Sequence, residues 1–374
     1  MDPKTKQETK AMVKGMWASI QDRADVASAK MRRDDGAEID VAVVKSTLND
    51  EVPPKEKHVR TLKMATTGSC PRQQVNYTIA GLVNRLEAGK ENWLITLKTL
   101  IVFHRLMREV DPSFQDELLK FGERTSTRRM LRLDGFADHT TKETWDFSAW
   151  VRLYSVYLDE RLDCFRTIKF DPENDKNMDG LLKTCGSSEM LERLPIVQRL
   201  LSRMVACLPS GSACSNEIVL LSANMVLREV RAVYKIVCEG IMNLADKFFE
   251  MGRNDATRAL DIYKENVVLN EKLNTFFNGV NNVSGMRGQV QLPTLQALPP
   301  DFQTTLEEYV KEAPKENGMP SPAAPAAAPT AASLVNNIRQ GGTTSAALGG
   351  TASPSAMPPP MAAPPGVSLK IGAP

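Results

Sequence analysis

Residues 93–110 read WLITLKTLIVFHRLMREV, and the spacing of apolar residues in this segment indicates the fold class. Its apolar side chains recur every three or four residues, at Leu94, Leu97, Leu100, Ile101 and Leu106. This period is that of an α-helix, and its density of apolar residues indicates a helix that is buried on most sides. His104 lies within the run and is more typical of a hydrogen-bonded core residue than of a catalyst.

The same helical period continues on both sides of this segment, so we predict an all-α chain. The other predicted helices of the central part are residues 38–48, 58–66, 73–86, 114–121, 145–162, 188–207, 217–251, 255–277 and 302–311. No segment alternates with a period of two between hairpin turns, and therefore no sheet is predicted. Short connections favour antiparallel neighbours stacked into a superhelical solenoid without a fixed repeat period.

The composition excludes several classes of protein. The net charge is only +2 over 374 residues, so any attraction of this protein to an anionic partner must come from a local patch. The longest apolar runs fall short of the roughly 18 residues that span a bilayer, and the charged N-terminus is not secretory. Six cysteines without a CxxC pair and three histidines predict no metal site, no cofactor and reduced thiols. Since nucleotide-binding and catalytic motifs are also absent, we predict a cytoplasmic protein that is not an enzyme and has no catalytic residues.

The chain divides into three parts. Residues 1–37 form an N-terminal segment, residues 38–312 form the helical domain, and residues 313–374 form a tail rich in Ala, Pro, Gly and Ser. This tail cannot bury enough apolar surface to fold, so we predict that it is disordered.

The N-terminal segment contains a predicted amphipathic helix at residues 10–20. One of its faces carries Met12, Val13, Met16, Trp17 and Ile20. Two interpretations of this face stand side by side. Either Trp17 inserts into the interface of a membrane, or the helix docks on the domain and hides the face.

A basic cluster at residues 45–58 is the main functional signal. Lys45 ends one predicted helix, and Lys55, Lys57 and His58 lie at the start of the next. The loop between the helices lets these groups converge, and the positive end of the second helix favours an anion at the same place. Lysines and a histidine donor suit an inositol polyphosphate. The alternative is that they are solvated surface charges.

The spacing Lys45-x9-Lys55-x-Lys57-His58 resembles the phosphatidylinositol 4,5-bisphosphate motif of ANTH domains in clathrin-assembly proteins. Further segments are similar to that family in the same order: NW at 92–93, WVRLY at 150–154, LPIVQ at 194–198, DKFFEM at 246–251 and LDIY at 260–263. The resemblance covers roughly residues 38–314 and is much more specific than any single motif.

The resemblance implies an ANTH superhelix that binds a membrane containing phosphatidylinositol 4,5-bisphosphate, with Lys45, Lys55, Lys57 and His58 as the headgroup ligands. It implies a peripheral membrane adaptor at clathrin-coated pits and vesicles of the plasma membrane, with the Golgi apparatus as a second location. It also implies that vesicle-associated SNAREs bind a groove at Val226 and Met251, for which core packing is the alternative. Clathrin is the expected coat partner. The tail, however, contains no DLL, DPF, NPF or clathrin-box motif, so direct clathrin binding is not predicted from it.

Two other classes remain open at this stage. A helical protein-interaction scaffold similar to VHS domains predicts no lipid selectivity. An RNA-binding protein requires a long basic stripe with stacking aromatics, whereas this chain offers one compact cluster, so no nucleic-acid partner is expected.

Overall fold

A computed structural model describes residues 3–32, 34, 36–127, 129–169, 171, 181–293 and 300–314. Its helices are α1 (Pro3–Met31), α2 (Gly36–Ser46), α3 (Glu56–Met64), α4 (Arg72–Ala88), α5 (Trp93–Glu109), α6 (Ser113–Arg124), α7 (Thr144–Ile168), α8 (Leu181–Thr184), α9 (Ser187–Val205), α10 (Glu217–Lys247), α11 (Arg253–Asn282) and α12 (Pro300–Glu312). These residues include no strand, and the predicted all-α class is confirmed.

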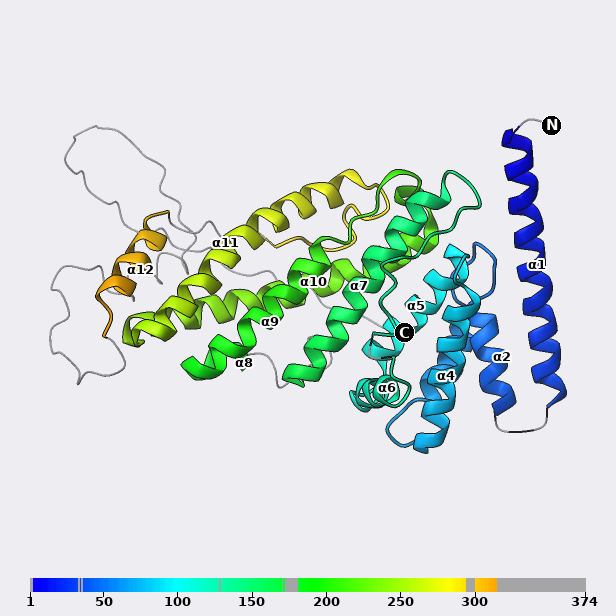
Figure 1. Ribbon diagram of the computed structural model, residues 1–374, viewed down its shortest axis with the longest axis horizontal. Helices are drawn as coiled ribbons and strands as arrows, with labels where there is room; N and C mark the ends of the chain where they lie inside the picture. The colour runs from blue at the N-terminus through cyan, green and yellow to red at the C-terminus, as the bar shows by residue number, and fades with distance from the viewer. Residues whose placement is uncertain are drawn as a thin grey trace, which may run out of the picture.

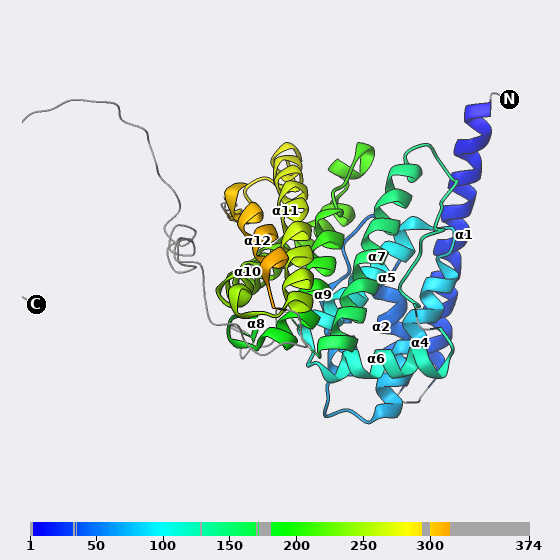
Figure 2. The same cartoon turned by 60° about the vertical axis from the view of Figure 1, so that its left-hand side comes forward.

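The helices form an elongated stack that begins with α1 at one end and finishes with α12 at the other (Figure 1). Contacts follow the chain: α1 packs on α2, α2 on α3 and α4, α4 on α5, α5 on α7, and α7 on α9. At the far end, α9 packs on α10 and α11, and α11 packs on α12. Figure 2 shows the same succession from a second direction, with α1 at the outer edge. The predicted solenoid of neighbouring helices is therefore confirmed.

The decisive segment forms α5 at the centre of this stack. Asn92 starts the helix, since its side chain accepts hydrogen bonds from the backbone N–H groups of Leu94 and Ile95, each at 3.1 Å. Leu97 and Phe103 have no exposed surface. A helix that is covered on all sides reads as a nearly continuous apolar run, which is the pattern seen in the sequence.

A buried polar network joins α5, α7 and α10. His104 bonds the Tyr154 hydroxyl through Nδ1 and the Glu229 carboxylate through Nε2, each at 2.7 Å. Arg161 donates to Glu229 at 2.5 Å and to Asp171 at 3.0 Å. Burial lowers the pKa of His104, whereas Arg161 and His104 together hold the pKa of Glu229 below its ordinary value against the effect of burial. His104 is thus a core residue, as its apolar surroundings in the sequence indicate.

Helix α1 differs most from the prediction, because it runs over Pro3–Met31 rather than residues 10–20. After residue 20, large apolar residues no longer recur every three or four positions, so the apolar pattern does not show that the helix continues. Asp22 explains why the helix continues: its carboxylate pairs with Arg85 on α4, and both side chains are buried. Asp22 also accepts the backbone N–H of Asn49 at 3.0 Å. The short helix α8 was likewise not predicted.

Within the described ranges, no helix is both long enough and apolar enough to cross a membrane. The predicted disorder of residues 313–374 lies almost entirely outside the described residues, which end at Pro314.

Candidate functional site

Two buried cations hold the loop that joins α2 to α3. Lys98 on α5 donates to the carbonyl oxygens of Leu48 at 2.8 Å and Asp50 at 2.5 Å. Arg85 on α4 donates to the Thr47 hydroxyl at 2.8 Å and to its carbonyl oxygen at 2.9 Å. Since Lys98 and Arg85 are 1% and 6% exposed, these bonds are sheltered from water and fix the loop against the core.

The four predicted site residues lie on both sides of this fixed loop. Lys45 is in the last turn of α2, Lys55 is the N-cap residue of α3, and Lys57 and His58 belong to its first turn. Lys55 and Lys57 are exposed, whereas Lys45 and His58 are half-buried. Lys55 has extended backbone geometry, and no side chain caps the N–H groups of α3. The start of α3 therefore keeps backbone donors and a positive dipole end for an anion.

The acidic residues nearby are all held by other partners. Asp50 pairs with Lys98, Glu51 accepts from the Asn216 side chain at 3.2 Å, and Glu56 pairs with Arg105 at 2.7 Å. The bonds from Arg105 lower the pKa of Glu56, so this carboxylate stays ionised while it is held against α5. Lys45, Lys55 and Lys57 consequently have no carboxylate partner among the residues that the structure describes.

The pKa of His58 indicates that the three lysines lie close to its side chain. Burial lowers its pKa most, and Lys45, Lys57 and Lys55 lower it further. Like charges act on a titrating group in this way only when they are near it. The structure thus brings together the four residues that the sequence singles out, and the charges that act on His58 among the described residues are all lysines.

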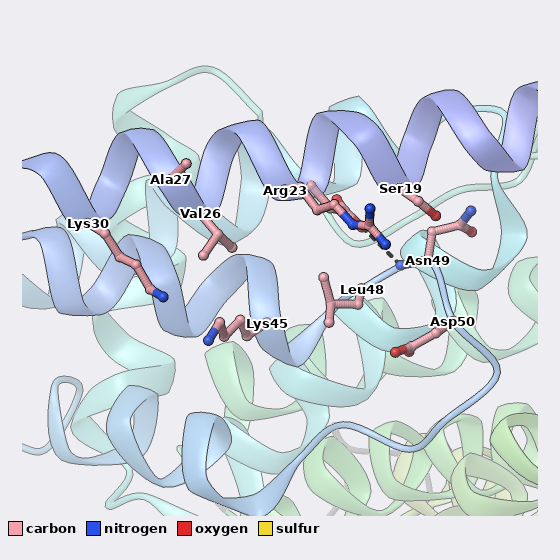
Figure 3. Close-up of a pocket in the computed structure, with 10 residues that line it drawn as sticks. Ser19, Arg23, Val26, Ala27, Lys30, Lys45, Leu48, Asn49 and Asp50 are labelled. Atoms are coloured by element: carbon pink, nitrogen blue, oxygen red, sulfur yellow. Dashed lines mark hydrogen bonds between the residues drawn. The ribbon is translucent and has the colours of Figure 1, made fainter.

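A pocket of about 480 Å³ lies beside this cluster, between α1 and the end of α2. Lys45 lines it together with Arg23 and Lys30 of α1, as Figure 3 shows. Sequence reasoning missed Arg23 and Lys30. Their spacing of seven residues, which is two helical turns, is a signal that places both on one face of a helix.

The model of the ANTH domain family matches residues 38–312. The chain belongs to the ANTH domain family. The match spans the helices from α2 to α12 and includes the loop that carries the basic cluster.

Curated relatives agree with this assignment. The Arabidopsis thaliana proteins At5g57200 and At2g01600, each named "Putative clathrin assembly protein", are both 39% identical to this chain. The alignments cover 81% and 82% of this chain but only 52% and 54% of those proteins. The chain therefore spans about half the length of the curated relatives it matches.

The structure of this ANTH domain buries the two residues predicted to form a SNARE groove. Val226 on α10 has no exposed surface, and Met251 is 5% exposed. Tyr309 ties α12 to the segment that follows α10, since its hydroxyl donates to the carbonyl oxygens of Phe249 at 2.6 Å and Met251 at 3.0 Å. Core packing, the alternative left open by the sequence, describes both residues in this conformation.

The predicted apolar face of α1 stays exposed although the helix is docked on the ANTH domain. Met12 is 77% exposed, Trp17 is 65% exposed and Met16 is 55% exposed. Helix α1 docks through the opposite side, where Gly15 accepts a bond from Asn49 and Asp22 pairs with Arg85. The interpretation that docking hides this face is therefore wrong, because the docked side is a polar one that the apolar pattern did not reveal.

Proposed function

We propose that this chain is a membrane adaptor for clathrin-mediated endocytosis that binds phosphatidylinositol 4,5-bisphosphate through Lys45, Lys55, Lys57 and His58. The observation that supports the headgroup site most is the set of three lysines around His58 that have no carboxylate partner among the described residues, while Asp50, Glu51 and Glu56 are held elsewhere. Each basic group near an anionic surface contributes about 1 kcal/mol, so the cluster alone gives reversible binding. The adaptor role is supported by the ANTH family match and by the names of the relatives.

Vesicle flotation tests this function. Wild-type protein is mixed with vesicles that contain phosphatidylinositol 4,5-bisphosphate, or phosphatidylserine at the same total charge, at one salt concentration. We expect clear preference for the phosphoinositide, because clustered ammonium groups match clustered phosphates better than dispersed carboxylates. Equal binding to both vesicles leaves only general electrostatic attraction, and absence of binding to either favours the protein-interaction scaffold.

Binding is expected to tighten as the pH falls from about 7.5 to about 6. Burial and the three lysines lower the pKa of His58 in the free protein, so it is neutral at the higher pH. A bound phosphate opposes this effect and raises that pKa, which means that binding takes up a proton. We expect an affinity increase of about threefold to tenfold beyond that of His58→Gln, measured on phosphoinositide vesicles. Identical pH profiles for the two proteins would exclude His58 as the group responsible.

The exposed face of α1 is proposed as a second membrane contact, with Trp17 inserted among the headgroups. Trp17→Ser is expected to weaken vesicle binding about tenfold, because a tryptophan side chain loses its burial in the interface. Trp145→Ser is a matched control, since Trp145 is 53% exposed on α7. Equal effects of the two substitutions on flotation would contradict insertion of α1.

Sorting of a SNARE helix is proposed as a further role of the α10–α12 end. Because α12 covers Met251, a cargo helix reaches this surface only by taking the place of α12. Tyr309→Ala removes two hydrogen bonds that hold α12, so it is expected to increase the affinity for a vesicle-SNARE peptide about fivefold. Fluorescence anisotropy of the labelled peptide measures this, and a peptide that binds neither protein would exclude the role.

The proposed adaptor role includes association with clathrin and a location in the cell. We propose recruitment to coated pits at the plasma membrane, where phosphatidylinositol 4,5-bisphosphate would be the docking lipid, with the trans-Golgi network as the second location. Co-localisation of the tagged chain with clathrin light chain at the cell surface tests the assignment. A purely diffuse signal would contradict it.

A further inference from the structure

The docked position of α1 gives its basic residues a fixed place beside the headgroup cluster. The pair between Asp22 and Arg85 is buried, and Asn49 bonds both Asp22 and the carbonyl oxygen of Gly15. These contacts hold one face of α1 at two points, Gly15 and Asp22, which are two helical turns apart. Arg23 directly follows Asp22, so its backbone is held by the same contacts.

The pocket between α1 and α2 has a net positive charge, because both of its acidic residues are paired with cations outside its lining. Its charged lining residues are Asp22, Arg23, Lys30, Lys45 and Asp50. Asp22 is neutralised by Arg85, and Asp50 is neutralised by Lys98, which lies outside the lining. Three cations then remain, and none has a carboxylate partner within the described part of the chain.

The shape of the pocket suits a ligand with more than one phosphate. Arg23 and Lys30 are seven residues apart, which places their backbones about 10 Å from each other along α1. Figure 3 shows Lys30 and Lys45 extending from the two helices toward the same end of the pocket, with Arg23 farther along α1. Val26 and Leu48 add apolar surface to the lining. An inositol ring with separated phosphates fits this arrangement better than a single inorganic phosphate does.

Lys45 connects this pocket to the cluster at α3. It lines the pocket, and it also lies close enough to His58 to lower the pKa of that residue. Lys45 is therefore common to the pocket beside α1 and to the cluster at the start of α3.

We propose that the pocket between α1 and α2 is a phosphomonoester subsite in which Arg23 and Lys30 act with Lys45, so that α1 supplies part of the phosphoinositide site. This inference rests on the proposed function. It adds residues outside the region that matches the family model, which begins at residue 38. Helix α1 would then bind the lipid headgroup through one edge and the membrane through its exposed apolar face.

Isothermal titration of the full chain with soluble inositol 1,4,5-trisphosphate tests the subsite without a membrane. The variant Arg23→Gln/Lys30→Gln removes the two α1 cations, and Arg228→Gln/Arg231→Gln removes the same charge from an exposed stretch of α10. We expect about 25-fold weaker binding in the first variant, which is about fivefold for each charge, and at most about twofold in the control. Circular dichroism melting shows whether each variant keeps its fold.

Each outcome separates the subsite from the proposed function. If the α1 variant binds as the control does, while Lys55→Glu/Lys57→Glu loses binding, the subsite is wrong and the lipid function stands. If wild-type protein binds neither the trisphosphate nor phosphoinositide vesicles, both fail. Titration with inorganic phosphate tests whether the pocket selects a lipid headgroup or any free phosphate. Affinity for inorganic phosphate equal to that for the trisphosphate would overturn a headgroup subsite.

Discussion

Arg161→Met is expected to lower the free energy of unfolding by about 3–5 kcal/mol. The substitution leaves the carboxylates of Glu229 and Asp171 without the guanidinium that pairs with both, at 2.5 Å and 3.0 Å. Glu229 is 1% exposed and Asp171 is 2% exposed, so water does not replace the lost partner. Arg108 stays 3.4 Å from Glu229, and Gln115 still donates to Asp171 at 2.8 Å. Methionine keeps much of the side-chain volume, so the loss measures the weakened pairing of buried charges rather than a cavity. Urea unfolding followed by circular dichroism gives the value.

A surface pair provides the control for this prediction. Lys264 and Glu307 are 2.9 Å apart, with side chains that are 45% and 37% exposed. Lys264→Met is expected to cost less than about 1 kcal/mol, because water screens and replaces such a pair. If Arg161→Met costs no more than this control, the network that joins α5, α7 and α10 is not important for the stability of the stack.

Lys55→Glu/Lys57→Glu is expected to weaken binding to phosphatidylinositol 4,5-bisphosphate vesicles by at least about 100-fold. Each substitution removes an attractive charge and adds a repulsive one in a cluster whose lysines have no carboxylate partner within the described part of the chain. Both side chains are exposed, so the fold is expected to remain intact. Flotation at matched salt measures the affinity, and thermal melting verifies the fold.

The matched control reverses two charges elsewhere. Arg228→Glu/Arg231→Glu changes the net charge equally on α10, where both side chains are exposed. We expect it to weaken vesicle binding less than about tenfold. Comparable losses in the two variants would mean that vesicles respond to net charge rather than to the cluster at α3.

The sequence predicts most of this fold because the apolar residues of the buried helices recur every three or four positions. Helix α5 was predicted over residues 93–110 and observed over Trp93–Glu109. The second half of α1 was missed because its docking uses Asp22 and an arginine 63 residues away rather than an apolar stripe. Long-range polar pairs of this kind leave no periodic signal in a sequence.

In the candidate site, too, some residues could be predicted from the sequence and others only from the fold. Lys45, Lys55, Lys57 and His58 could be selected because they flank one short loop. The residues that fix this loop, Lys98 and Arg85, lie on α5 and α4, and only the fold brings them to it. Arg23 and Lys30 of α1 line the pocket beside the site, and only the fold brings them next to Lys45. Spacing along the chain thus identifies local clusters, whereas the residues that position or complete them depend on packing.

Lysine acetylation footprinting locates the headgroup on the protein, because a bound headgroup shields the lysines that it contacts. The full chain is acetylated briefly with and without vesicles that contain phosphatidylinositol 4,5-bisphosphate, and modification at each lysine is measured by mass spectrometry. We expect protection of Lys45, Lys55 and Lys57, with Lys264 and Lys272 on α11 unchanged. Vesicle binding with unprotected Lys55 and Lys57, or with uniform protection of all five lysines, would contradict a headgroup site at the junction of α2 and α3.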